Sequence, residues 1–129
     1  MRDVVIAAIF TSDGLLVGQR ESEPFKGYWE CPGGKVEAGE SLIEALIREI
    51  AEEGDTVVTT ARALFDYDVI TPQGPLHLTW FHTTIDSSFK PVIYQNMKII
   101  KKEEVDALSW IPHNVMHLEK LKAAFPIQI

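Results

Sequence analysis

The sequence predicts an α+β domain in which several strands surround one long helix and a second helix closes the chain. Short apolar segments rich in β-branched residues, each followed by turn residues, occur on both sides of one amphipathic segment. That amphipathic segment begins with a helix-capping pattern, and a shorter helical pattern lies near the C-terminus. Because strands and helices do not alternate regularly, the pattern favours an α+β architecture over repeated strand-helix-strand units.

The first strands are expected near the N-terminus. Residues 4–10 form a continuous apolar run, and the turn residues 12–14 precede a second strand over residues 15–20. A loop with proline and glycine covers residues 21–27, and residues 28–31 form a short extended piece. These segments predict a hairpin followed by a brief third strand.

The long helix is predicted to begin at Leu42 and to run through about Glu53. Ser41 and Glu44 form a Ser-x-x-Glu capping box, which satisfies free backbone N–H groups at a helix start. The apolar residues that follow give the helix a broad buried face. Gly54 is expected to end it in the left-handed conformation.

Beyond the helix the pattern returns to strands. Their expected positions are residues 56–68, 76–85 and 105–111. A tight turn over residues 71–75 separates the first two. A loop is expected over residues 86–102, and a closing helix over about residues 115–124.

Composition narrows the class of protein. With 129 residues and 46% hydrophobic content, the chain can bury one substantial core, so residues 1–129 are expected to form a single domain. A net charge of −7 argues against binding of nucleic acid polymers or anionic membranes, which both require basic surface. The apolar N-terminus is too short to span a bilayer. A single cysteine fits a reducing cytoplasm. The chain is expected to be a monomer or a homodimer.

Three carboxylates stand together near the end of the long helix. Glu49, Glu52 and Glu53 are spaced i, i+3 and i+4, which places them on one side of a helix. At a helix C-terminus each negative charge costs about 0.3–1 kcal/mol. The cluster becomes favourable if a hard divalent cation binds between the carboxylates. The alternative is an ordinary solvated acidic face.

The spacing around these carboxylates resembles the Nudix box, the signature of the Nudix hydrolases. From Gly34 the order is five residues, Glu40, seven residues, and then Arg48-Glu49-Ile50-Ala51-Glu52-Glu53. The chain departs from the family pattern at its end, where Gly54 comes one residue early. The resemblance implies an α/β/α sandwich around a mixed sheet, with one box helix and a C-terminal helix. It also implies hydrolysis, dependent on Mg²⁺ with Mn²⁺ as a substitute, of a pyrophosphate linkage in a nucleoside diphosphate derivative.

The resemblance assigns roles to residues in and near the box. The metal ligands carried over are Glu49, Glu52, Glu53 and the backbone carbonyl of Gly33, with Glu40 supporting the metal through water. Arg48 is expected to pair with a box carboxylate and hold it in place. Glu53 or Glu49 is the first choice as general base, and Glu104 is the second. Glu104 lies six residues before Trp110, as in MutT-type enzymes, although it also fits a plain charged loop.

Four further residues are expected near the substrate. Arg20 ends a strand at a position where MutT-type enzymes hold an arginine that contacts the nucleotide, although a solvated strand end is the alternative. Cys31 is interpreted as a small apolar wall residue near the base. Gly34 and Lys35 belong to the turn after Pro32, where glycine allows the backbone to approach a ligand closely.

The short chain most resembles small MutT-type enzymes that convert (deoxy)nucleoside triphosphates, including oxidised ones such as 8-oxo-dGTP, to monophosphate and pyrophosphate. The alternatives are an ADP-ribose or other nucleotide-sugar pyrophosphatase, a non-catalytic nucleotide-sensing module, and an acidic structural domain without chemistry. Many MutT-type chains carry a late Pro-Ala-Asn or Pro-Ala-Asp segment that reads the purine edge. Residues 123–127 offer no such polar side chain, which predicts a loose base preference.

Overall fold

The structure is a computed structural model that describes residues 1–126, apart from the side chains of residues 115 and 116. Its strands are β1 (Arg2–Thr11), β2 (Gly14–Arg20), β3 (Trp29–Glu30), β4 (Gly33–Lys35), β5 (Val58–Thr71), β6 (Gly74–Ile85) and β7 (Tyr94–Ile100). Its α-helices are α1 (Leu42–Gly54) and α2 (Leu118–Ala123), and two 3₁₀ helices, η1 (Lys102–Ala107) and η2 (Pro112–His117), lie between β7 and α2. No helix in this described part is long and apolar enough to cross a membrane.

The strands form one mixed sheet, as predicted. Its order is β3-β2-β1-β6-β5, with β4 paired to β1 and β7 paired to β2. The β1–β6 pair is parallel and the other pairs are antiparallel. At the centre, Ile6 of β1 pairs with Trp80 of β6 on one side and with Gly33 of β4 on the other. The central strand β1 therefore pairs directly with the strand that contains Gly33.

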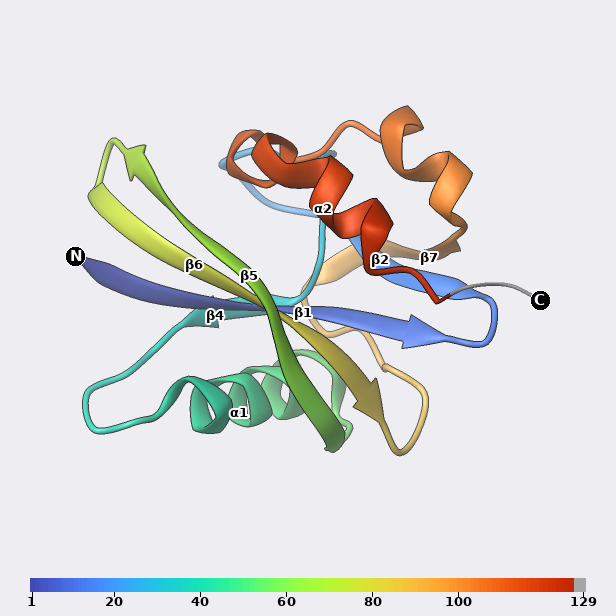
Figure 1. Ribbon diagram of the computed structural model, residues 1–129, viewed down its shortest axis with the longest axis horizontal. Helices are drawn as coiled ribbons and strands as arrows, with labels where there is room; N and C mark the ends of the chain where they lie inside the picture. The colour runs from blue at the N-terminus through green and yellow to red at the C-terminus, as the bar shows by residue number, and fades with distance from the viewer. Residues whose placement is uncertain (127–129) are drawn as a thin grey trace.

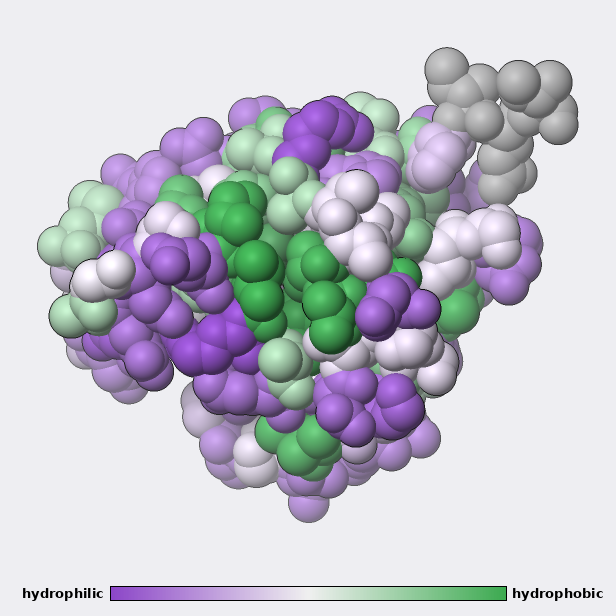
Figure 2. All heavy atoms as spheres, turned by 90° about the horizontal axis from the view of Figure 1, so that it is seen from below, coloured by the Kyte–Doolittle hydropathy of each residue, from purple (hydrophilic) through white to green (hydrophobic). Residues whose placement is uncertain are grey.

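Alternation along β1 builds a hydrophobic layer on each face of the sheet. Val5, Ala7 and Ile9 pack against α1, whereas Ile6 and Ala8 face the opposite layer, to which α2 belongs. Figure 1 shows α1 below the sheet and α2 above it. The expected α/β/α sandwich is thus confirmed. Figure 2 looks onto the α1 face, where hydrophobic side chains gather near the centre and hydrophilic ones surround them.

The start of α1 is as predicted, but its end is not. Ser41 and Glu44 make both bonds of the capping box. The residue in the left-handed conformation is Asp55, with φ +48°, whereas Gly54 is the last helical residue. A Cβ at Gly54 would lie 2.3 Å from ring carbons of Phe89. The early glycine therefore makes room for the loop after β6, and the prediction of Gly54 as the left-handed cap was wrong.

The expected loop over residues 86–102 is wrong, because it contains β7. Only Tyr94 and Ile100, at the two ends of this strand, are buried. The strand therefore lacks the apolar alternation by which a half-buried strand is recognised. Its order comes from pairing with β2 along its whole length.

The strand expected over residues 105–111 is also wrong. That stretch begins within η1, and Trp110 forms only an isolated bridge with Trp29. The closing helix is shorter than expected, because η2 occupies the first part of its range and α2 begins at Leu118. Pro112 at the start of η2 has no N–H to donate, which suits a helix start but not a continuing strand.

Candidate active site

Glu53 is a buried carboxylate held beside the first glycine of β4. Its side chain is 8% exposed, and Oε1 accepts a hydrogen bond from the backbone N–H of Gly33 at 3.0 Å. Burial, together with the nearby charge of Glu49, raises the pKa of Glu53 to about 8. In the metal-free protein this carboxyl group is therefore protonated near neutral pH.

Glu49 packs against the second glycine of β4. A Cβ at Gly34 would lie 2.4 Å from the carboxylate carbon of Glu49, so only glycine leaves room for this contact. Burial raises the pKa of Glu49, whereas its hydrogen bond with Arg48 acts in the opposite direction. Gly33 and Gly34 thus lie against the carboxylates of Glu53 and Glu49, which both belong to α1.

Arg48 joins the remaining box carboxylates. It donates two hydrogen bonds to Glu40, at 2.7 and 2.9 Å, one to Glu49 at 2.9 Å and one to Glu52 at 3.2 Å. A further bond to the backbone oxygen of Lys35, at 3.0 Å, ties this cluster to β4. The bond with Arg48 lowers the pKa of Glu40 to about 2. Arg48 therefore pairs with box carboxylates, which is the contact that the resemblance implies for it. Glu40 contacts Arg48 directly.

The donor atoms at this site suit a hard divalent cation. They are carboxylate oxygens and a backbone carbonyl, which Mg²⁺ and Mn²⁺ accept, and Glu53 is a buried carboxyl group with no cationic partner. As placed, Glu49 and Glu52 turn toward Arg48, and within the described residues no three His, Cys, Asp or Glu side chains are grouped to hold a metal ion. Metal binding by Glu49, Glu52, Glu53 and Gly33 stays a prediction.

A cavity of about 820 Å³ opens beside β4. Its lining includes all four residues expected near the substrate, Arg20, Cys31, Gly34 and Lys35, together with Gly33. The Cys31 side chain is buried, and burial raises the pKa of its thiol above the ordinary range, so the thiol is neutral and unreactive as expected for a wall residue. Gly34 and Lys35 were expected in a turn, but they belong to strand β4, which pairs with β1. The carboxylate cluster and the cavity therefore meet at the two glycines of β4.

Asn114 is a residue of this cavity that the sequence reasoning missed. It lines the cavity, is only 3% exposed, and within the described residues its Oδ1 and Nδ2 make no hydrogen bond of acceptable geometry. Burial raises the pKa of Tyr67, and the amide lies close enough to the Tyr67 hydroxyl to act against that shift. That hydroxyl, however, already donates to the backbone oxygen of His113 (2.9 Å) and accepts from the Trp80 indole (3.0 Å). An unpaired buried amide costs about 1–3 kcal/mol, which makes Asn114 a strong candidate for a ligand contact.

The expectation that the chain offers no polar side chain to the base rests on residues 123–127 alone, and the structure places one buried amide, that of Asn114, in the cavity. Of residues 123–127, Ile127 lies outside the described residues. The run Pro112-His113-Asn114 shows the same proline-x-asparagine order two residues after Trp110, and this order is the sequence signal for Asn114. The loose base preference stays a prediction.

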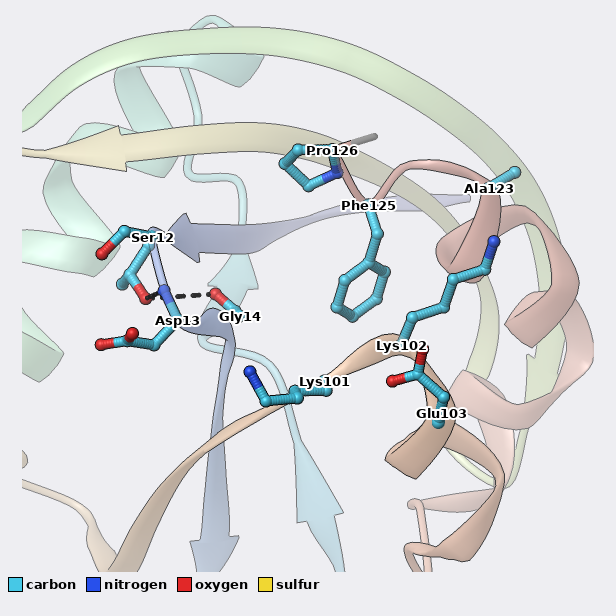
Figure 3. Close-up of a pocket in the computed structure, with 10 residues that line it drawn as sticks. Ser12, Asp13, Gly14, Lys101, Lys102, Glu103, Ala123, Phe125 and Pro126 are labelled. Atoms are coloured by element: carbon cyan, nitrogen blue, oxygen red, sulfur yellow. Dashed lines mark hydrogen bonds between the residues drawn. The ribbon is translucent and has the colours of Figure 1, made fainter. Parts of the chain in front are cut away.

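Glu104 is not brought to the carboxylate cluster. It lies in η1, where its exposed side chain accepts from the backbone N–H of Lys101 at 2.9 Å. Strand β7 starts beside Arg20 and ends beside Leu15, and Glu104 follows this far end. A second cavity, of about 570 Å³, lies there between the β1–β2 turn and Lys101, Lys102 and Phe125 (Figure 3). Among residues 1–126, no hydrogen bond or ion pair joins Glu104 to α1.

Comparison with known proteins gives one family. The NUDIX domain family model matches residues 1–128. The putative 8-oxo-dGTP diphosphatase 2 of Mycobacterium tuberculosis is 53% identical over 51 residues, which are 39% of this chain and 36% of that protein. An ADP-ribose pyrophosphatase of Methanocaldococcus jannaschii is 45% identical over 51 residues, which are 39% of this chain and 30% of that protein. These matches thus span about a third of the relatives' lengths.

The fold is shared with a solved structure from work on MutT of Aliivibrio salmonicida and Vibrio cholerae. The TM-score is 0.83 at 26% identity, over 95% of this chain and 97% of that one. The resemblance therefore extends well beyond the box, through the strands and helices that line the cavity.

Proposed function

Because this chain belongs to the MutT-type Nudix family, we propose that it hydrolyses the pyrophosphate linkage of a nucleoside triphosphate, releasing monophosphate and pyrophosphate. The observation that carries this proposal is the contact of Glu53 and Glu49 with the glycines of β4, Gly33 and Gly34, at the edge of a cavity of about 820 Å³. The triphosphate would lie along these glycines and the nucleoside would occupy the cavity. A bound divalent metal ion would also explain how a chain of net charge −7 can bind the negatively charged phosphates of its substrate.

The residues at the helix end would share the chemistry. Mg²⁺, or Mn²⁺ in its place, would be held by Glu49, Glu52, Glu53 and the Gly33 carbonyl and would neutralise charge on the phosphate oxygens. Arg48 restrains the carboxylates of Glu49 and Glu52 so that they stay on this side of α1. Glu53 or Glu49 would accept the proton of the attacking water, since both carboxylates lie against the glycines of β4 that border the cavity.

Asn114 supports a definite base preference. Its amide offers one acceptor and one donor side by side, and a base edge with the complementary pair would satisfy both. Guanine presents two acceptors, N7 and O6, on its major-groove edge. Oxidation at C8 places a hydrogen on N7, which turns that edge into a donor beside an acceptor. Adenine, with its N7 acceptor beside the N6 amino donor, offers such a pair without oxidation. We therefore rank oxidised guanine and adenine nucleotides above unoxidised guanine, in place of the loose preference expected from the sequence.

The Asn114→Ala variant tests this assignment. We expect the wild-type protein to favour 8-oxo-dGTP over dGTP in kcat/KM by at least ~10-fold, and the variant to lose about tenfold of that ratio, because one buried hydrogen-bond pair is worth about 1–3 kcal/mol. The measurement is kcat/KM with Mg²⁺ for ordinary and oxidised triphosphates, ADP-ribose and dinucleoside polyphosphates. Asn96→Ala is the matched control, since that exposed amide binds Gln19 instead.

An unchanged ratio in the Asn114 variant would remove Asn114 from base recognition. If ADP-ribose surpassed every triphosphate by more than ~10-fold, the triphosphate assignment would be wrong while family membership would stand.

A further inference from the structure

Arg20 is held at two points within the cavity that the proposed function assigns to the nucleotide. Its Nη1 lies 2.9 Å from Oε1 of Glu30, and its Nε donates to the backbone oxygen of Pro24 at 2.8 Å. Within the described residues, Nη2 has no hydrogen-bond partner. The guanidinium group is therefore fixed on one side and leaves donors free on the other.

Glu30 is itself fixed in place. It belongs to β3, where it pairs with Gly18 of β2, and its side chain is only 15% exposed. Burial raises the pKa of Glu30, while the bond and charge of Arg20 act against that shift. Arg20 and Glu30 both line the cavity, so an arriving ligand meets the pair rather than an isolated cation.

The charge of this pair limits what Arg20 can bind. A carboxylate at 2.9 Å compensates the guanidinium charge, and it would repel a phosphate group that approached the same place. The charge of Glu30 also reaches Glu53, where, in addition to burial, it helps to raise the pKa of that carboxyl group. The free donors of Arg20 therefore suit an uncharged acceptor, such as a base carbonyl or a ribose hydroxyl.

We infer that Glu30 is a positioning residue that fixes Arg20 for the nucleoside part of the ligand and keeps it from serving as a phosphate site. This inference rests on the proposed function for the kind of ligand. It assigns the two ends of the nucleotide to separate groups: Arg20 with Asn114 at the nucleoside, and the glycines of β4 with the α1 carboxylates at the phosphates.

The test uses calorimetric binding of two probes, 8-oxo-dGMP and inorganic pyrophosphate, each with Mg²⁺. We expect Glu30→Gln and Arg20→Gln each to weaken binding of the monophosphate by about tenfold. The double variant should bind it no more weakly than Arg20→Gln alone, because both changes remove one function. Pyrophosphate affinity should stay unchanged or increase in Glu30→Gln, since a negative charge is removed.

The opposite results would overturn the inference. If Glu30→Gln and Arg20→Gln weaken pyrophosphate as much as the monophosphate, Arg20 binds phosphate. If the two substitutions add in full, Glu30 does not act through Arg20. Glu21→Gln, an exposed change of the same kind, is the control and should alter neither affinity.

The experiment remains decisive if one variant does not fold, and it distinguishes this inference from the proposed function. Should Glu30→Gln fail to fold, as judged by its melting temperature, Arg20→Gln alone still decides between nucleoside and phosphate by the probe that it weakens. Because the readout is affinity, a wild-type protein that binds the monophosphate without hydrolysing any triphosphate would refute the proposed function and leave the role of Glu30 to be decided by the variants.

Discussion

Replacing Glu53 with Gln is expected to lower kcat by at least ~10²-fold without loss of the fold. Glutamine keeps the shape of the side chain and can still accept the hydrogen bond from Gly33 N–H. It cannot carry the charge that a metal ligand or a general base requires. Because burial and Glu49 already disfavour the charged form in the metal-free protein, the neutral side chain should not destabilise it.

The measurement is steady-state hydrolysis of a triphosphate with Mg²⁺, together with the melting temperature of the variant. Glu103→Gln is a suitable control, since it removes a charge from an exposed position in η1. Glu104→Gln tests the second candidate base, and an unchanged rate there would leave the α1 assignment intact. Near-normal turnover of Glu53→Gln would contradict the assignment of the catalytic site to the end of α1.

The second large effect concerns stability and pH. The metal-free protein is expected to become less stable as the pH rises from about 5 to 8. The folded-state pKa of Glu53 is about 8, above the ordinary value of 4.5, so the folded protein retains a proton that the unfolded chain has lost between these values. The stability contributed by this proton is complete below the unfolded pKa and is lost as the pH approaches 8, at up to ~1.4 kcal/mol per pH unit.

Other groups contribute to the same slope. The pKa of Glu49 is raised by burial, and the pKa of His77 is raised by its bond with Asp68, so both act in the same direction as Glu53. Denaturant unfolding in EDTA at several pH values should therefore be compared between wild type and Glu53→Gln. We expect the two proteins to diverge by roughly 2–4 kcal/mol across this range, with the variant more stable at pH 8.

Mg²⁺ provides the complementary arm of this experiment. At pH 8 the ionised carboxylates repel each other, and binding of a cation only to the folded state would stabilise it. Wild type should gain stability on titration with Mg²⁺ and Glu53→Gln should gain much less. Parallel pH curves of the two proteins would show that Glu53 does not hold a buried proton. An equal gain in stability with Mg²⁺ would show that Glu53 takes no part in metal binding.

Local signals predicted the parts of the fold that are set by short-range chemistry. The capping box at Ser41 and Glu44 fixed the start of α1, because its two hydrogen bonds involve residues three apart. Strand β7 escaped prediction because pairing with β2 orders it, and its exposed residues carry no periodic pattern. The end of α1 depends on Phe89, a contact from a distant loop that spacing within the box does not reveal.

The candidate site divides in the same way. Glu49, Glu52 and Glu53 follow from one helix period, so their grouping on one side of α1 was visible in the sequence. Helix periodicity did not show their partners: Gly33 was named only through the resemblance, and the bond of Arg48 to the Lys35 backbone oxygen depends on the pairing of β4 with β1. Asn114 and Glu30 enter the cavity from segments far apart in the chain, and only the fold shows that they line one space.

The most direct test of the central claim is product analysis in ¹⁸O-labelled water. The wild-type protein should convert a nucleoside triphosphate and Mg²⁺ into nucleoside monophosphate and pyrophosphate, with one labelled oxygen in one of those two products. Mass spectrometry would also show which phosphorus the water attacks. Nucleoside diphosphate with label confined to inorganic phosphate would contradict the proposed pyrophosphatase.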